Sequence, residues 1–250
     1  MRRPRLREAT GRRTFTRMPA KPEFRYIGRG LYSLSDAERL GRIPRARIRR
    51  WMEGYWYSSG GKKRRSAAVI HSDISREVGE LALTFADLME IRFLDAFRKH
   101  GVSWHSIRIA AHRVGNLINS THPFSTRTFK TDGRTILAEI AHPTEGEQLL
   151  DLVKNQWELQ KIVSRHLFAG IEFDDNDNPR LWTPVKGLRV VVDPLRAFGA
   201  PIAVDGSVPT SVLAAAAKAE RSQRHAALYF RVPLRAVQDA VAFERKYAAA

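Results

Sequence analysis

The stretch from Ser33 to Tyr57 constrains the fold most, because it spells out two short helices joined by a tight turn. Ser33 followed three residues later by Asp36 is a capping-box start, and Gly41 is expected to end the first helix in a left-handed conformation. Pro44 opens the second helix, since a proline in the first turn gives up only a backbone N–H that has no partner there.

The second helix separates its apolar side chains from its cations. At about 100° per residue, Ile48, Trp51 and Met52 share one arc, and arginines spread over the rest of the surface. An apolar arc packed on the first helix, with cations facing outward, is what a helix-turn-helix recognition helix requires. A solvated surface helix rich in arginine is the alternative. The DNA contacts predicted in this stretch are Ser35, Arg45, Arg47, Arg49 and Arg50.

Charge is concentrated at one end of the chain. The formal net charge is +17, and residues 1–65 hold 20 Lys and Arg against 5 Asp and Glu, whereas residues 66–250 hold 23 against 21. This asymmetry indicates a polyanionic partner at the N-terminal end. We expect residues 1–30 to form a basic flexible arm, which either lies on DNA or is a leader without a role.

A glycine pair, Gly60-Gly61, marks a loop tip after the second helix. A hairpin-like wing at this position could straddle DNA phosphates with its cations, and a disordered linker is the alternative that stays open. The predicted phosphate contacts of the wing are Lys62, Lys63, Arg64 and Arg65.

A second helix pair follows. Thr84 with Asp87 repeats the capping-box pattern, Gly101 breaks the helix, and Ser103 caps the next one. The expected apolar faces are Leu88, Ile91, Leu94 and Phe97 in the first helix and Ile107, Ala110, Ala111, Val114, Leu117 and Ile118 in the second.

This order of helix-turn-helix, basic wing and helix pair resembles the MerR-type winged helix-turn-helix over roughly residues 31–118. The resemblance implies docking on double-stranded operator DNA through the second helix and the wing. The chain departs from the effector-sensing members, because it has no long heptad run and no cysteines to bind a metal.

The centre of the chain, residues 121–193, is expected to hold β-hairpins with one helix and to act as a linker or interaction region. Asp132-Gly133 suits a type I′ turn and places the first hairpin at 123–140. The other expected elements are a helix at about 145–166, a strand–turn–strand at 171–185 and a short strand at 188–193.

Residues 194–250 predict a C-terminal domain of three short helices, of the helix-turn-helix kind. This part resembles a small helical domain over about 196–247, with Arg221 where the family usually has glycine. Its apolar residues exceed what so small a unit needs, so they form either a dimer interface or simply its core: Val212, Leu228, Val237, Val241 and Phe243. The expected helices lie at about 209–219, 222–230 and 233–247.

The two modules together resemble a class of VapB-type antitoxins over nearly the whole chain. That resemblance implies a homodimer that represses its own promoter and neutralises a VapC-type PIN-domain ribonuclease toxin. A stand-alone MerR-like transcription regulator is the alternative function. The whole is expected to be mainly α (α+β), with segments at 1–30, 31–120, 121–193 and 194–250.

Other chemistry finds little support in the sequence. The absence of cysteine excludes a disulfide scaffold and a thiol nucleophile. An EF-hand loop that begins at Asp174 would need glycine and glutamate where Pro179 and Val185 stand, and the histidines lack metal-binding spacing. No apolar run approaches the ~18 residues of a membrane span. We therefore expect a cytoplasmic protein that is not an enzyme, with no catalytic residue, metal, cofactor or membrane contact.

Overall fold

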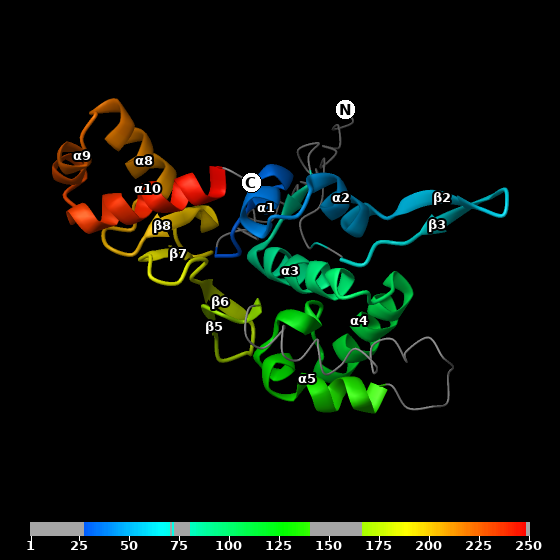
Figure 1. The fold of residues 1–250 in the computed structure, drawn as a ribbon. Helices are drawn as coiled ribbons and strands as arrows, with labels where there is room; N and C mark the ends of the chain where they lie inside the picture. Colours follow the sequence, from blue (N-terminus) through cyan, green and yellow to red (C-terminus); the bar gives the residue numbers. More distant parts are fainter. Residues whose placement is uncertain (1–27, 71, 73–80, 141–166, 249–250) are drawn as a thin grey trace, which may run out of the picture.

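The chain has a mixed α+β fold, seen in a computed structural model that describes residues 28–70, 72, 81–140 and 167–248 (Figure 1). Within these residues there are eight α-helices and three small antiparallel sheets. The expected arm at 1–30 and helix at 145–166 lie wholly or almost wholly outside the described residues. The α+β expectation is confirmed.

The first helix pair consists of α1 (Leu34–Gly41) and α2 (Arg45–Glu53). The capping box is present, because the backbone N–H of Ser33 donates to Asp36 Oδ2 at 3.0 Å and Asp36 N–H donates to Ser33 Oγ at 3.1 Å. The left-handed residue is Arg42, with φ of 53°, and not Gly41 as expected. Gly41 stays helical and lies against Ile43.

The glycine pair turns a two-stranded hairpin, which we call the wing. Its strands are β2 (Tyr55–Ser59) and β3 (Lys62–Ser66), paired from Tyr55–Ser66 to Ser59–Lys62. Gly60 and Gly61 have φ of 58° and 72°, the two positive values that a type I′ turn requires. The wing projects away from the other elements (Figure 1), so the disordered-linker alternative is wrong.

The second helix pair is α3 (Phe85–Lys99) and α4 (Trp104–Ile118). Thr84 and Asp87 form the predicted capping box, and Ser103 caps α4. The predicted apolar faces are buried except at Ala111 and Ile118, which are half-buried, and at Leu117, which is 50% exposed. A two-stranded sheet of β1 (Tyr32–Ser33) and β4 (Ala82–Leu83) joins the start of α1 to the start of α3.

The hairpin expected at 123–140 is wrong. A short 3-10 turn, η1 (Pro123–Ser125), leads instead into helix α5 (Arg127–Ile140). Thr126 Oγ1 accepts the backbone N–H of Phe129, which caps the helix. Gly133 lies in mid-helix under the ring of Phe129, where a Cβ would come within 3.3 Å. The glycine therefore makes room for an aromatic ring, and it forms no turn.

The second strand–turn–strand is confirmed and belongs to a four-stranded sheet in the order β5-β6-β7-β8. The predicted strand at 188–193 is its third strand, whereas β8 was not expected. The strands are β5 (Ile171–Phe173), β6 (Pro179–Trp182), β7 (Val190–Val192) and β8 (Pro201–Ala203).

The three C-terminal helices are confirmed as α8 (Thr210–Ala219), α9 (Gln223–Phe230) and α10 (Leu234–Ala248). Arg221 adopts the left-handed φ of 49° that glycine would take more easily. The turn between α8 and α9 therefore forms as it would with glycine at this position. It is closed by Ser222 N–H, which donates to Ala217 O at 3.2 Å.

One hydrophobic core joins segments from both ends of the chain. It contains Tyr32 and Ile48 from the first elements, Phe129 and Trp182 from the centre, and Phe243 from α10. The central region thus contributes buried side chains to this core, whereas α8, α9 and the inner face of α10 enclose a smaller core of their own.

Candidate nucleic-acid interface

The apolar arc of α2 is buried and its arginines are exposed. Ile48 and Trp51 lie in the core at 0% and 2% exposure, while Ser35, Arg45, Arg47, Arg49 and Arg50 are exposed. This division holds α2 on the core by one side only. Among the described residues, the outer side with its arginines is therefore left accessible to a partner.

Two of the four arginines pair with carboxylates. Arg45 Nε lies 2.8 Å from Glu38 Oε2, and Arg47 Nη1 lies 2.7 Å from Asp95 Oδ1. Both side chains still expose 61% and 46% of their surface. The guanidinium of Arg50 lies over the ring of Tyr55 at 5.9 Å. Within the described part of the chain, neither Arg50 nor Arg49 pairs with a carboxylate.

The register of the wing sorts its side chains onto two faces. Cross-strand pairs share a face, so Tyr57 lies beside Arg64, and Trp56 lies beside Arg65. We call the first the tyrosine face (Tyr55, Tyr57, Ser59, Lys62, Arg64 and Ser66) and the second the tryptophan face (Trp56, Ser58, Lys63 and Arg65). All four predicted cations are exposed, and none pairs with a carboxylate among the described residues.

The tyrosine face is continuous with α2 through an open cleft of about 480 Å³, which we call the basic cleft. The cleft brings together cations and aromatic rings from α2, β2 and the ends of α3 and α4. Trp51 and Trp104 meet edge to face at 5.3 Å, and Arg98 lies over Trp104 at 5.8 Å. The lining residues are Arg47, Arg50, Trp51, Tyr55, Arg98, Lys99 and Trp104.

A buried carboxylate braces the basic cleft. Asp95 is 4% exposed and holds Arg47 at 2.7 Å and Lys99 at 2.6 Å through its two oxygens. The sequence analysis missed Arg98, Lys99 and Trp104, since they follow α2 by more than 40 residues and only the packing of α3 on α1 brings them near. The clustering of Arg98 and Lys99 at one helix end was the available signal.

The five residues considered for a dimer interface do not share one environment. Val237 and Phe243 are at 0% exposure inside the chain's own core, and Val241 packs against the smaller core. Val212 and Leu228 are exposed at 41% and 76%. Val212 and Leu228 are therefore open to a second copy, the half-buried Val241 is partly so, and Val237 and Phe243 are covered within the chain.

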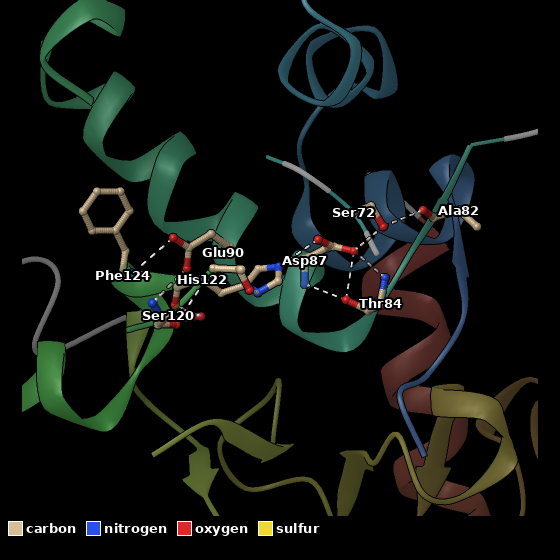
Figure 2. Close-up of polar contacts among 10 residues, drawn as sticks. Ser72, Ala82, Thr84, Asp87, Glu90, Ser120, His122 and Phe124 are labelled. Carbon is tan, nitrogen blue, oxygen red and sulfur yellow. Dashed lines mark hydrogen bonds and ion pairs between the residues drawn. The ribbon is translucent and has the colours of Figure 1, made fainter. Parts of the chain in front are cut away.

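Buried acidic groups form a network behind the helix pair (Figure 2). Asp87 accepts hydrogen bonds from Thr84 N–H and from the Ser72 hydroxyl, and its Oδ1 lies 2.8 Å from His122 Nε2. The two carboxylate oxygens of Glu90 accept the backbone N–H groups of Phe124 and Ser125 at 3.1 and 2.9 Å. The network therefore ties α3 to the turn before α5.

Burial and these contacts shift the pKa values of Glu90 and Asp87. Burial raises the pKa of Glu90 from 4.5 to about 6, against the opposing attraction of His122 and the hydrogen bonds from Phe124 and Ser125. Burial also acts to raise the pKa of Asp87, but the hydrogen bond and charge of His122, together with the hydrogen bonds from Thr84 and Ser72, outweigh it and hold that pKa below its ordinary value. Since the oxygens serve backbone amides and a cap, this cluster is a structural brace.

Two other features bear on cofactors and membranes. In the turn at 174–178, Asp174 Oδ1 accepts the backbone N–H groups of Asn176 and Asn178 at 2.9 Å each, which shapes a hairpin tip. Within the described ranges, no group of three or more His, Asp and Glu is arranged to hold a metal. The helices described there include none that is long and apolar enough to cross a membrane.

No family model matches the chain, but a curated protein and a solved structure are similar to it. A protein of Mycobacterium tuberculosis (strain ATCC 25618 / H37Rv) named "Putative antitoxin VapB45" is 28% identical over 187 residues, which cover 71% of this chain and 77% of that protein. The crystal structure of Rv2018 from Mycobacterium tuberculosis superposes with a TM-score of 0.64 at 23% identity, covering 84% of this chain and 96% of that one. The chain thus has the fold of Rv2018.

Proposed function

We propose that the chain is a VapB-type antitoxin that binds operator DNA as a homodimer, represses its own promoter and neutralises a VapC-type PIN-domain toxin. The name of its Mycobacterium tuberculosis relative supports the antitoxin role. The observation that carries the DNA-binding half is the continuous cationic surface formed by α2, the wing and the basic cleft. As a reading unit, α1, α2 and the wing form a MerR-like winged helix-turn-helix.

Each part of this surface has its own task. The outer side of α2 enters the major groove, where Arg49 and Arg50 are available to pair with guanine O6 and N7, each pair discriminating by about 1–3 kcal/mol. The wing follows the phosphate backbone with its cations. In the basic cleft, Arg98 and Lys99 hold a flanking phosphate, because Arg98 Nη1 donates to Val102 O and Lys99 pairs with Asp95, which fixes both in position.

Charge reversal on α2 tests the DNA-binding half. We expect Arg45→Glu combined with Arg49→Glu to weaken binding to the chain's own promoter by at least about 100-fold at moderate salt, since two contacts become repulsive. Titration of labelled promoter DNA measures the loss. The matched control is Lys218→Glu with Arg224→Glu, which makes the same charge change on exposed residues of α8 and α9. Equal binding by both double variants would show that α2 does not read DNA.

Co-expression tests the antitoxin half. A PIN-domain ribonuclease encoded beside this chain should co-purify with it, and cells that express the ribonuclease should survive only when the chain is present. Promoter binding without any such partner would favour the alternative, a stand-alone MerR-like regulator. The two halves are therefore separable, because promoter binding needs no toxin and rescue needs no promoter.

A further inference from the structure

A second open cleft, of about 580 Å³, lies between the base of the wing and α4, and we call it the polar cleft. Its volume falls within the range of small-molecule sites, roughly 300–1,000 Å³. One wall is apolar, and the other offers a cation, amides and Glu90, whose two carboxylate oxygens already accept the backbone N–H groups of Phe124 and Ser125. The residues that matter here are Val69, Ile70 and Leu94 on the apolar side and Arg108, Asn116 and Asn119 on the polar side.

Arg108 is incompletely satisfied in the wall of the polar cleft. Its Nη2 donates to the hydroxyl of Ser66, the last residue of β3. Its Nε is buried and has no acceptor among the described residues, and no carboxylate of those residues pairs with the guanidinium. A buried donor without an acceptor costs about 1–3 kcal/mol. The site therefore favours a ligand that brings an acceptor and a negative charge.

The Nε–Nη2 edge of Arg108 is covered while Nη2 donates to Ser66 and Nε is buried, and it selects the chemistry of a ligand that displaces Ser66. Nε and Nη2 form the side of the guanidinium that binds two oxygens of one carboxylate in parallel, whereas Ser66 offers a single oxygen. The apolar wall suits a hydrocarbon body. We propose that the polar cleft binds a small monocarboxylic acid with an apolar body, whose carboxylate takes the Nε–Nη2 edge of Arg108.

Occupation of the polar cleft reaches the DNA-binding surface through the base of the wing. A carboxylate on the Nε–Nη2 edge competes with Ser66, which pairs with Tyr55 across the wing. The next residues are tied to α2, because Val69 N–H and Ile70 N–H donate to Trp51 O at 2.8 and 3.2 Å. The acid releases the end of β3 and weakens operator binding. This consequence rests on the proposed function, whereas binding of the acid does not.

Binding of defined acids to the full chain tests the site. Titration calorimetry with benzoate, phenylacetate and hexanoate should show saturable binding by at least one acid, and the neutral analogue benzamide should not bind. We expect Arg108→Gln to weaken binding about 10-fold or more, as loss of a charged hydrogen bond implies. Lys218→Gln, which removes one exposed cation far along the chain, should bind as the unaltered protein does.

A second variant guards against misfolding of Arg108→Gln. Ala111 also lines the polar cleft, so Ala111→Leu fills the space while it keeps the arginine, and it should lose acid binding as well. The site is overturned if none of the three acids binds saturably, if benzamide binds as well as benzoate, or if both variants bind as the unaltered protein does. A water molecule then suffices for Arg108.

The regulatory consequence has its own measurement. The acid that binds should weaken promoter binding several-fold for the unaltered chain and leave Arg108→Gln unaffected, with sodium chloride at equal ionic strength as the control. Acid binding without this change would overturn the link to the wing. If the chain does not bind its promoter at all while acid still binds, the proposed DNA function fails and the polar cleft stands.

Discussion

Arginine does different work at the two ends of the molecule. On α2 and the wing, most cations lack a carboxylate partner among the described residues, and the few that have one stay about half exposed. Near the C-terminal helices, three arginines are paired: Arg235 with Asp239 at 3.0 Å, Arg189 with Asp205 at 2.9 Å and Arg196 with Asp193 at 2.6 Å. Arg221 and Arg224 are exposed there and have no carboxylate partner among the described residues. The carboxylates that lie nearby, and not residue type, decide whether an arginine is available to a partner.

The largest expected effect is on the salt dependence of DNA binding. With about 6–10 phosphate contacts, affinity for the promoter should fall by roughly 10³–10⁵-fold between 50 and 200 mM salt. Alanine at all four wing cations should lower the slope of log affinity against log salt by about 0.9 for each phosphate that is no longer neutralised. Anisotropy titrations at several salt concentrations measure the slope, and a slope unchanged by the four substitutions would remove the wing from the interface.

The next effect separates the two faces of the wing. The tyrosine face is continuous with α2 through Tyr55 and the basic cleft, so Lys62→Ala with Arg64→Ala should weaken promoter binding about 10- to 100-fold. Lys63→Ala with Arg65→Ala changes the same number of charges on the tryptophan face and should have a clearly smaller effect. The reverse ranking would mean that the wing meets DNA with its other side.

One paired and one unpaired arginine, Arg235 and Arg49, allow the two kinds of arginine to be compared directly. Arg235→Ala should lower the free energy of unfolding by about 1–3 kcal/mol, because it leaves the buried carboxylate of Asp239 with only the Arg189 N–H. Arg49→Ala should leave unfolding within about 0.5 kcal/mol, as surface changes usually do, and weaken promoter binding. Urea titrations and promoter titrations of both variants give the two readings. Loss of stability in Arg49→Ala would contradict the distinction.

The smallest effect is a pH dependence set by Glu90. Its pKa is raised in the folded state, so the stability it contributes is present below about pH 4.5 and is lost as pH rises to about 6, a change of roughly 2 kcal/mol. Asp87 has the opposite pH dependence, because its pKa is lowered in the folded state. The stability it contributes is present above its ordinary pKa of 3.8 and is lost as the pH falls further.

The Glu90→Gln variant tests whether Glu90 causes the loss of stability between pH 4.5 and 6. Glutamine is neutral, like the protonated Glu90 at pH 4.5, but its amide nitrogen cannot accept the second of the two N–H groups of Phe124 and Ser125, so it should be less stable by about 1–3 kcal/mol at that pH. Between pH 4.5 and 6 the variant should lose no further stability through this position. Unfolding curves at several pH values check both statements, and a decline that persists in the variant would assign it to another group.

Local sequence signals correctly predicted the elements whose caps or turns lie within a few residues of one another. The boxes at Ser33 and Thr84, the glycine pair of the wing and the three C-terminal helices all carry their signal within a few residues. Helix α5 was missed because Asp132-Gly133 is a turn signal in isolation, whereas the burial of Phe129 and Ile136 decides the outcome. Short-range pattern cannot weigh such burial.

The residues of the candidate site also fall into those that the sequence predicted and those that it did not. The cations of α2 and the wing were visible as a cluster in the sequence, and their exposure follows from helical and strand periodicity. The basic cleft was not visible, because Arg98, Lys99 and Trp104 reach it only through packing of α3 and α4. The partner of Arg47 was equally hidden, since Asp95 lies 48 positions away in the chain.

The contacts of β1 and α1 with the C-terminal part of the chain have a consequence for proteolysis. The Tyr32 hydroxyl donates to Gly199 O at 2.9 Å, Arg39 pairs with Glu244 at 3.0 Å, and Phe243 and Tyr247 lie in the same core as α1 and α2. Trimming of the tail by a protease would therefore undermine the far end as well. A single cut would therefore destabilise the elements of the proposed DNA-binding surface together with the C-terminal helices.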